Sequence, residues 1–178
     1  MGEFMMNDTT LPLVIRKPVK TDAAAMLEYL KIVGGESDNL TFGKEGHPFT
    51  VEQEEIFLEG VSKNNNQIML LGIIDNQIVS SGSLGGSPRE RLKHTMELGI
   101  SVRKEYWNQG IARKIIEALF EEARKLPYLK QISLHVRADN QAAIHLYQSL
   151  GFVQTGVFPN QMHINDLFID TLFMIKTL

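Results

Sequence analysis

The sequence predicts an α/β (α+β) fold, in which one mixed sheet of seven strands is covered by helices. Strand-like and helix-like stretches follow one another along the chain in the order β, α, α, β, β, β, α, β, α, β, β. At the centre of this order one strand–helix–strand crossover places its two strands parallel. The 178 residues, 43% of them hydrophobic, can form a substantial core without disulfides.

The first part of the chain predicts one strand and two helices. Thr21 or Asp22 can cap the first helix, which Gly34–Gly35 is expected to end, and Thr50 with Gln53 forms a capping box for the second. The expected elements are a strand over residues 13–16, a helix over 23–33, a loop over 36–49 and a helix from 51 to about 63.

A hairpin follows. Residues 67–74 and 77–84 are apolar, β-rich runs joined by Asp75–Asn76, which is typical of a tight two-residue turn. Residues 85–88, Gly-Gly-Ser-Pro, predict a loop before the next strand at 94–103.

The second half begins with an amphipathic helix after Trp107. Its apolar stripe comprises Ile111, Ile115, Ile116, Leu119, Ala123 and Leu126, and Pro127 stops it. A strand over 131–137, a short helix capped by Asn140 and ending at Leu150–Gly151, and strands over 152–158 and 167–175 complete the prediction.

Composition excludes several classes of function. Cysteine is absent, so disulfides, thiolate metal sites and a cysteine nucleophile are excluded, and the lack is compatible with the cytosol. The net charge is −3 and no basic stripe is present, so we expect no nucleic-acid partner. No apolar run reaches the roughly 20 residues of a membrane span. Residues 1–10 lack the features of a signal peptide and are interpreted as a leader that is disordered or derives from an expression vector, with one domain over 11–178.

The segment from Glu97 to Ala112 is the most informative of the chain. It predicts a strand, a short polar turn and a helix that begins near Gly110. Free backbone N–H groups and the helix dipole at such a turn favour a pyrophosphate, and the small residues Gly110 and Ala112 permit close approach. The turn therefore indicates a nucleotide-bearing cofactor, with an ordinary strand–helix turn as the alternative. The Gly-x-Gly-x-x-Gly and Walker motifs are absent.

A second segment runs from Asn140 to Phe152 and reads Asn-Gln-Ala-Ala-Ile-His-Leu-Tyr-Gln-Ser-Leu-Gly-Phe. Together the two segments resemble the GNAT superfamily of acetyl-coenzyme A-dependent N-acetyltransferases. In that family the phosphate loop reads Arg/Gln-x-x-Gly-x-Gly/Ala, and Trp107 departs from its first position. The later family pattern is matched by Asn140, Ala143, Leu146, Tyr147, Gly151 and Phe152.

The resemblance implies a mostly antiparallel sheet with helices on both faces and a central parallel pair that splays apart near Ile100–Val102 and Leu134–Val136. Pantetheine would lie against the first of these strands and the diphosphate on the turn amides. The implied acetyl-CoA contacts are Ile100, Ser101, Val102, Trp107, Asn108, Gln109, Gly110, Ile111, Ala112, Arg113, Asn140, Ala143 and Tyr147.

Two residues are catalytic candidates. The resemblance assigns Tyr147 as the acid that protonates the departing thiolate, and a core aromatic is the alternative. Strand alternation places Glu97 on one face with Gly99 and Ser101, so it is the candidate base, with a solvated or salt-bridged strand glutamate as the alternative.

Further polar residues are weaker candidates. Glu36 and Asp38 could hold a cationic amine, and His163 and Asp166 could line the acceptor pocket, although solvated loops explain all four. His135 and His145 lack the spacing of metal ligands, so no metal is expected, and Ser81 and Ser83 lack a serine-hydrolase context.

The sequence thus predicts an N-acetyltransferase that moves an acetyl group from acetyl-CoA to a primary amine by direct attack. The acceptor is a small-molecule amine or a protein N-terminus or lysine, and a homodimer through the late strands is possible. The alternative from another class is a non-catalytic acyl-CoA-binding module.

Overall fold

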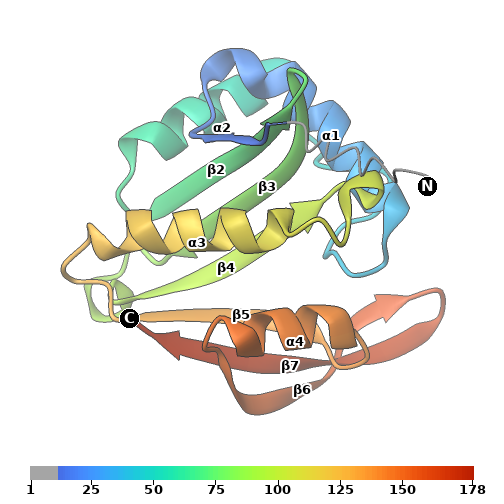
Figure 1. Cartoon of the computed structure of the whole chain (residues 1–178), viewed down its shortest axis with the longest axis vertical. Coiled ribbons are helices and arrows are strands. Elements are labelled where there is room, and N and C mark those ends of the chain that lie inside the picture. Colours follow the sequence, from blue (N-terminus) through green and yellow to red (C-terminus); the bar gives the residue numbers. More distant parts are fainter. Residues whose placement is uncertain (1–11) are drawn as a thin grey trace, which may run out of the picture.

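A computed structural model describes residues 12–178 (Figure 1), so the expected leader over 1–10 lies outside the described residues. Seven strands form one sheet in the order β1-β2-β3-β4-β5-β7-β6. The strands are β1 Val14–Arg16, β2 Gln67–Ile74, β3 Gln77–Gly86, β4 Thr95–Val102, β5 Gln131–Arg137, β6 Val153–Ile164 and β7 Leu167–Thr177. The helices are α1 Ala23–Glu36, α2 Val51–Lys63, α3 Ile111–Arg124 and α4 Gln141–Ser149, with short 3₁₀ turns at Lys20–Asp22, Glu90–Leu92 and Lys104–Tyr106.

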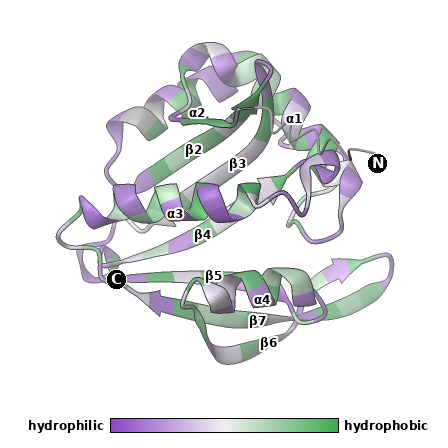
Figure 2. Cartoon of the chain, in the orientation of Figure 1, coloured by the Kyte–Doolittle hydropathy of each residue, from purple (hydrophilic) through white to green (hydrophobic). Residues whose placement is uncertain are grey.

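Two hydrophobic cores lie on opposite faces of the sheet. Helices α1 and α2 pack on β2 and β3 around Tyr29, Leu58 and Leu71. On the other face α3 and α4 pack over β2 to β5 around Ile115 and Leu134. Figure 2 shows the resulting pattern on α3, where hydrophobic and hydrophilic residues alternate along the ribbon because one face of the helix is apolar and the other is polar.

The sheet opens at its centre. All neighbouring strands are antiparallel except β4 and β5. These two pair only from Thr95↔Gln131 to Glu97↔Ser133, although both strands continue beyond that point. The separation widens toward their carboxyl ends, as Figure 1 shows, and the predicted splayed pair is confirmed.

Three local predictions are confirmed. Thr50 Oγ1 accepts from the Gln53 amide while the Thr50 amide donates to Gln53 Oε1, which is the capping box of α2. Asp75 and Asn76 have φ angles of 48° and 60° and join β2 to β3. Asn140 Oδ1 accepts from the Ala143 amide and caps α4.

Several predicted boundaries are wrong. Helix α1 continues through Gly34–Gly35 to Glu36. Gly34 does not end the helix but allows the following loop to pack closely against it, since a Cβ at Gly34 would lie 2.0 Å from the Gly43 carbonyl oxygen. Gly85 and Gly86 belong to β3, where they pair with Glu97 and Met96. Strand β6 runs on to Ile164 because irregular pairing after Phe158 absorbs Pro159.

The Asp22 side chain does not cap α1. Instead its carboxylate accepts two hydrogen bonds from Arg16 and one from the Val19 amide. The Arg16 guanidinium, as the main cause, holds the pKa of Asp22 below its ordinary value.

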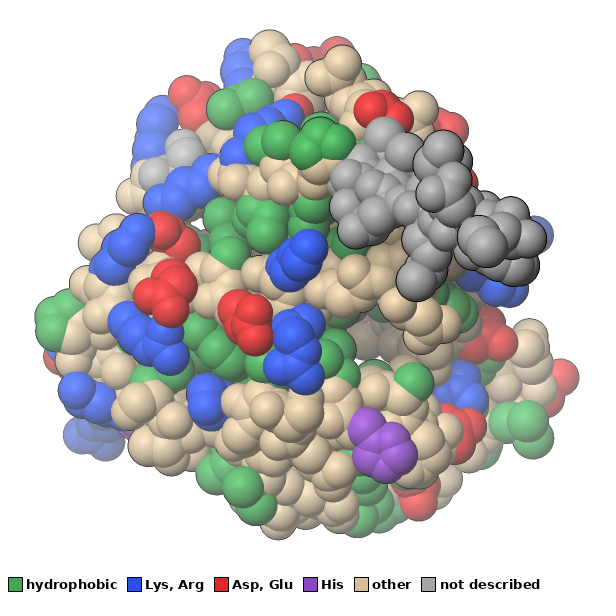
Figure 3. Space-filling view, viewed as in Figure 1, with side chains coloured by type: hydrophobic (Ala, Val, Ile, Leu, Met, Phe, Trp, Pro, Cys, Tyr) green, Lys and Arg blue, Asp and Glu red, His purple; other side chains and the backbone are tan. Residues whose placement is uncertain are grey.

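The face that carries α3 shows Lys and Arg side chains interspersed with Asp and Glu, with no stripe of one sign (Figure 3). Of the helices in residues 12–178, none has both the length and the apolar character that a membrane crossing requires.

Candidate active site

A cavity of about 930 Å³ occupies the opening in the sheet. Its lining includes Ile111 and Tyr147 on the α3–α4 face and Phe42, Phe57 and Glu97 on the α1–α2 face. The cavity therefore passes through the sheet and joins its two sides. In Figure 3 a recess lies beside the N-terminal end of α3.

The turn before α3 presents free amides at one wall of this cavity. Asn108 and Gly110 have φ angles of 59° and 74°, in the left-handed region that Asn and Gly tolerate. The Lys114 amide donates to the Gly110 carbonyl to begin the helical ladder, and no side chain of residues 12–178 caps the helix. The amides of residues 110–113 thus lack intrahelical partners and are available to an anion.

The exposed edge of β4 forms a second wall. The Arg103 amide donates to the Val79 carbonyl on β3 at 2.9 Å, so alternation directs the backbone of Ser101 toward β3 and that of Ile100 and Val102 toward the opening. The side chain of Ser101 lies on the α1 face, where its Oγ is 2.8 Å from the Tyr29 hydroxyl. An extended chain in the opening could pair with Ile100.

The side chain of Trp107 already binds one of the backbone groups that face the opening, the carbonyl of Val102. Its indole Nε1 donates to the Val102 carbonyl at 2.7 Å, and Lys104 Nζ lies 6.0 Å from the ring centroid. This side chain therefore fastens the turn to the end of β4. Gln109 is the one predicted cofactor contact outside the cavity lining; its Nε2 donates to the Glu105 carbonyl.

Tyr147 lies deep on the α4 side of the cavity. It is 8% exposed and packs edge-on against Phe152, with ring centroids 5.8 Å apart. Within the described part of the chain its hydroxyl has no hydrogen-bond partner, and burial raises the pKa of Tyr147 to about 12. The phenol is therefore protonated at neutral pH and free to donate.

Glu97 lies on the other face of β4 from Tyr147's helix. It is the last β4 residue paired with β5, opposite Ser133, and its side chain is exposed. It therefore stands where the two strands begin to separate, at the cavity wall. His135 lines the same cavity from β5, with Nδ1 3.4 Å from Thr171 Oγ1.

The α1–α2 side of the cavity is aromatic and apolar. The rings of Phe42, His47 and Phe57 line the cavity, and the exposed ring of Phe49, outside the lining, joins them into a chain with centroid separations of 5.4, 5.9 and 6.3 Å. Burial lowers the pKa of His47, which favours its neutral form. Glu54 of α2 also lines the cavity and is 0% exposed.

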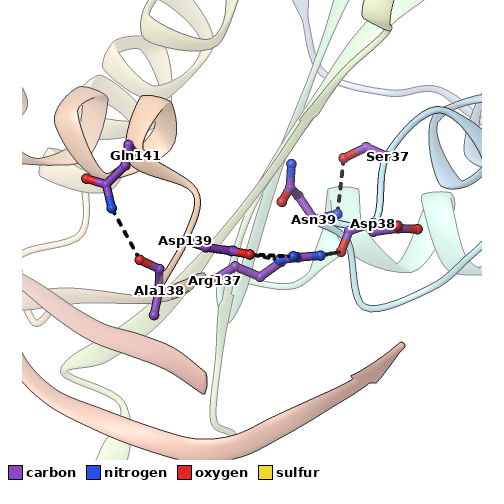
Figure 4. A network of polar contacts seen from close by, with 7 residues as sticks. All are labelled: Ser37, Asp38, Asn39, Arg137, Ala138, Asp139 and Gln141. Atoms are coloured by element: carbon purple, nitrogen blue, oxygen red, sulfur yellow. Dashed lines mark hydrogen bonds and ion pairs between the residues drawn. The ribbon is translucent and has the colours of Figure 1, made fainter. Parts of the chain in front are cut away.

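Arg137 ties the end of β5 to the loop between α1 and α2 (Figure 4). It donates to both carboxylate oxygens of Asp139 at 2.9 and 2.7 Å and, through Nη1, to the Asp38 carbonyl at 3.0 Å. The neighbours of Asp38, Ser37 and Asn39, line the cavity. The arginine therefore holds this loop in place on the α1–α2 side of the cavity.

Of the weaker candidates, Glu36, Asp38, His145, His163 and Asp166 lie outside the cavity lining. The Glu36 carboxylate accepts from the Lys104 amide at 2.8 Å, and Asp38 is engaged through its carbonyl. His145 is exposed on α4, His163 stacks on Phe168 at 4.6 Å, and Asp166 lies in the turn between β6 and β7. Ser81 and Ser83 line the cavity from β3.

Glu54 and Arg137 are the residues that sequence reasoning missed. A signal for Glu54 is present, because it lies four and seven residues before Leu58 and Val61 on the buried stripe of α2. A charged residue on such a stripe is uncommon and points to a special role. Arg137 carries no comparable signal, since its loop partner is 99 positions away.

Comparison with known proteins identifies relatives of this chain. The model of the Acetyltransferase (GNAT) family matches residues 36–152. A crystal structure of an acetyltransferase of the GNAT family from Streptococcus pneumoniae superposes with a TM-score of 0.91 and 34% identity, over 94% of this chain and 100% of that one. The structure of yncA from Salmonella typhimurium with its cofactor acetyl-CoA superposes with a TM-score of 0.81 at 21% identity, over 94% of each chain, which shows a shared fold.

A curated relative, the L-amino acid N-acyltransferase MnaT of Escherichia coli, is 30% identical over 56% of this chain. That match spans 59% of the relative's own length. The family model covers well over half of this chain, and the whole of the pneumococcal structure superposes on this chain. This chain belongs to the acetyltransferase (GNAT) family.

Proposed function

We propose that this protein is an N-acetyltransferase that transfers the acetyl group of acetyl-CoA to a primary amine by direct attack. The observation that carries the proposal is the cavity through the sheet, which joins an anion-binding turn on one face to an apolar pocket on the other. Two substrates could meet there without either crossing the core.

The residues present fit acetyl-CoA, which supplies the acetyl thioester. The uncapped amides of residues 110–113 and the dipole of α3 suit a diphosphate. The outward backbone of Ile100 suits an extended amide-bearing chain, as in strand addition to a sheet edge. All of the acetyl-CoA contacts, including those of Ile100, residues 110–113, Ser101, Gln109 and Asn140, stay predictions.

Two side chains would move protons in this reaction. The amine nitrogen forms the new C–N bond as the C–S bond breaks, and one amine proton passes to a base. Glu97, directly or through water, is our candidate for that base, because it stands where β4 and β5 separate. Tyr147, protonated at neutral pH, would donate a proton to the leaving sulfur.

The rival function is a module that binds acyl-CoA without turnover. The hydroxyl of Tyr147, which lines the cavity without a hydrogen-bond partner among residues 12–178, favours catalysis, because a binding module needs no proton donor for a thiolate. Small-molecule amines and protein N-termini or lysines are both retained as acceptor classes. A homodimer through β6 and β7, whose Val157, Phe158 and Phe168 are exposed, and a cytosolic location stay predictions; light scattering would test the dimer.

The proposed function is tested by mixing the full chain with acetyl-CoA and a panel of primary amines. We expect amine-dependent release of free CoA thiol together with an equal amount of N-acetylated product detected by mass spectrometry. Tight acetyl-CoA binding with no thiol release for any amine or peptide would support the binding module instead.

A further inference from the structure

Glu54 is a buried carboxyl group without a partner. It is 0% exposed, and neither of its carboxyl oxygens has a hydrogen-bond partner within the described residues. Buried polar groups are nearly always hydrogen-bonded, so each exception calls for an explanation. Glu54 belongs to the residues that line the cavity, although its carboxyl oxygens are covered; a rotation of this side chain toward the cavity would let a ligand there supply the missing partner.

The surroundings of Glu54 define what such a ligand looks like. The cavity residues contributed by α1, α2 and the loop between them are largely apolar, and include Met26, Leu30, Leu40, Phe42, Phe57 and Val61. Among the cavity-lining residues of the described chain, Arg113 is the one Lys or Arg, and it lies at the start of α3 on the opposite face of the sheet. There Arg113 is engaged with Ser149 and, at 3.5 Å, with Glu117.

A carboxylate on the acceptor would therefore meet no Lys or Arg side chain among the described residues that line the α1–α2 side of the cavity. It would instead face the carboxyl groups of Glu54 and Glu97 and the imidazole rings of His135 and His47, and burial favours the neutral form of His47. An acceptor with a positive charge on an apolar body is, in contrast, complementary to this side of the cavity. Its charge could pair with the buried carboxylate of Glu54, and its body could pack on the aromatic rings, which also offer cation–π contacts.

We propose that Glu54 binds the ammonium group of the acceptor, and that the acceptor is a primary amine on an apolar or aromatic body with no carboxylate beside the nitrogen. This inference rests on the proposed transferase function and names its substrate class. The proposed acceptor, which lacks a carboxylate, differs from the L-amino acids after which the relative MnaT is named. Burial raises the pKa of Glu54, and an arriving ammonium group would stabilise its ionised form. The ammonium group would first give one proton to the Glu54 carboxylate, and the neutral amine would then attack the thioester and lose its second proton to Glu97.

The test compares three acceptors of one shape: phenethylamine, L-phenylalanine and L-phenylalaninamide. We expect kcat/KM for phenethylamine to exceed that for phenylalanine at least about tenfold, with the uncharged amide between them. Equal or better use of phenylalanine would overturn the assignment of the substrate class.

The variant Glu54→Gln preserves the size of the side chain and removes its charge. We expect it to raise KM for phenethylamine about tenfold or more while KM for acetyl-CoA stays within about twofold, and Glu54→Asp to restore part of the loss. Glu55→Gln, one residue along α2 and paired with Lys20 outside the cavity, is the matched control. An unchanged amine KM in folded Glu54→Gln would show that Glu54 is only a structural core residue.

Calorimetric titration of phenethylamine into CoA-loaded protein separates this inference from the proposed function. Binding by the wild type that Glu54→Gln abolishes supports the role of Glu54 even if no acetyl group is transferred. Absence of binding by the wild type contradicts the role of Glu54, whether or not other amines are acetylated.

Discussion

At the scale of single residues, the hydroxyl of Tyr147 carries the proton-donor hypothesis. Tyr147→Phe retains the ring that packs on Phe152 and removes the proton. Because general acid catalysis contributes about 10²–10⁴-fold, we expect kcat to fall within that range. The dissociation constant for acetyl-CoA and the melting temperature should change little.

Steady-state kinetics with calorimetry measures this effect, and Tyr128→Phe is the control. The Tyr128 hydroxyl donates to the Asn65 carbonyl, outside the cavity. If kcat of Tyr147→Phe stays within about threefold of wild type, the leaving thiolate takes its proton from another donor.

The buried carboxyl of Glu54 also predicts a dependence of stability on pH. Burial raises its pKa in the folded state above the ordinary value of 4.5, so the folded protein binds this proton more tightly than the unfolded chain does. The stabilisation that the bound proton provides is full below pH 4.5 and is lost as the pH rises through the folded pKa.

Urea unfolding across this pH window measures the effect. Relative to wild type, Glu54→Gln should gain about 1–3 kcal/mol of unfolding free energy as the pH rises from about 4 to neutral, the cost of an unpaired buried charge. The difference between the two proteins is the informative quantity, because groups such as Asp22, with a lowered pKa, have the opposite dependence in both. A constant difference would mean that Glu54 titrates normally.

At the scale of elements, the turn before α3 is expected to bind the diphosphate of acetyl-CoA. Gly110→Asp adds a negative charge at the N-terminus of α3, where a bound phosphate would lie, and should weaken binding about tenfold or more. Gly110→Asn is the control, because Asn has nearly the same size and tolerates the φ of 74° without the charge. Calorimetry should give equal affinities for both variants if the turn has only a structural role.

The contact between β5 and the α1–α2 loop predicts a positioning role for Arg137. Arg137→Lys retains the charge but not the planar group that contacts Asp139 and the Asp38 carbonyl together. We expect KM for the amine to rise about threefold to tenfold, with KM for acetyl-CoA nearly unchanged. An equal rise in both KM values would indicate general loosening of the fold.

At the scale of the whole molecule, the sequence predicted what is decided locally. The Asp75–Asn76 turn and the Thr50–Gln53 capping box form between residues close in the chain, and both were predicted correctly. The end of α1 was not, because the reason for Gly34 is the carbonyl of Gly43 in the following loop. A glycine that permits close packing and one that ends a helix look alike in sequence.

In the candidate site, too, the parts built from nearby residues could be predicted and the parts built from distant residues could not. The turn and the capped α4 are continuous segments, and so the residues around Gly110 and Asn140 could be found by pattern. The proposed acceptor side is assembled from α1, α2, β4 and the intervening loop, and so the buried carboxyl of Glu54 became evident only once these elements were packed together. The parallel pair followed from the crossover, while its separation was implied by the family resemblance alone.

The central claim is that acetyl-CoA lies across the turn of α3 and in the opening between β4 and β5. Residue-resolved amide hydrogen exchange with and without acetyl-CoA tests it most directly. We predict new protection at two separate places, the amides of residues 110–113 and the outward-facing amide of Ile100, with little change on β1 or β6. Protection confined to other strands, or at the turn without Ile100, would contradict it.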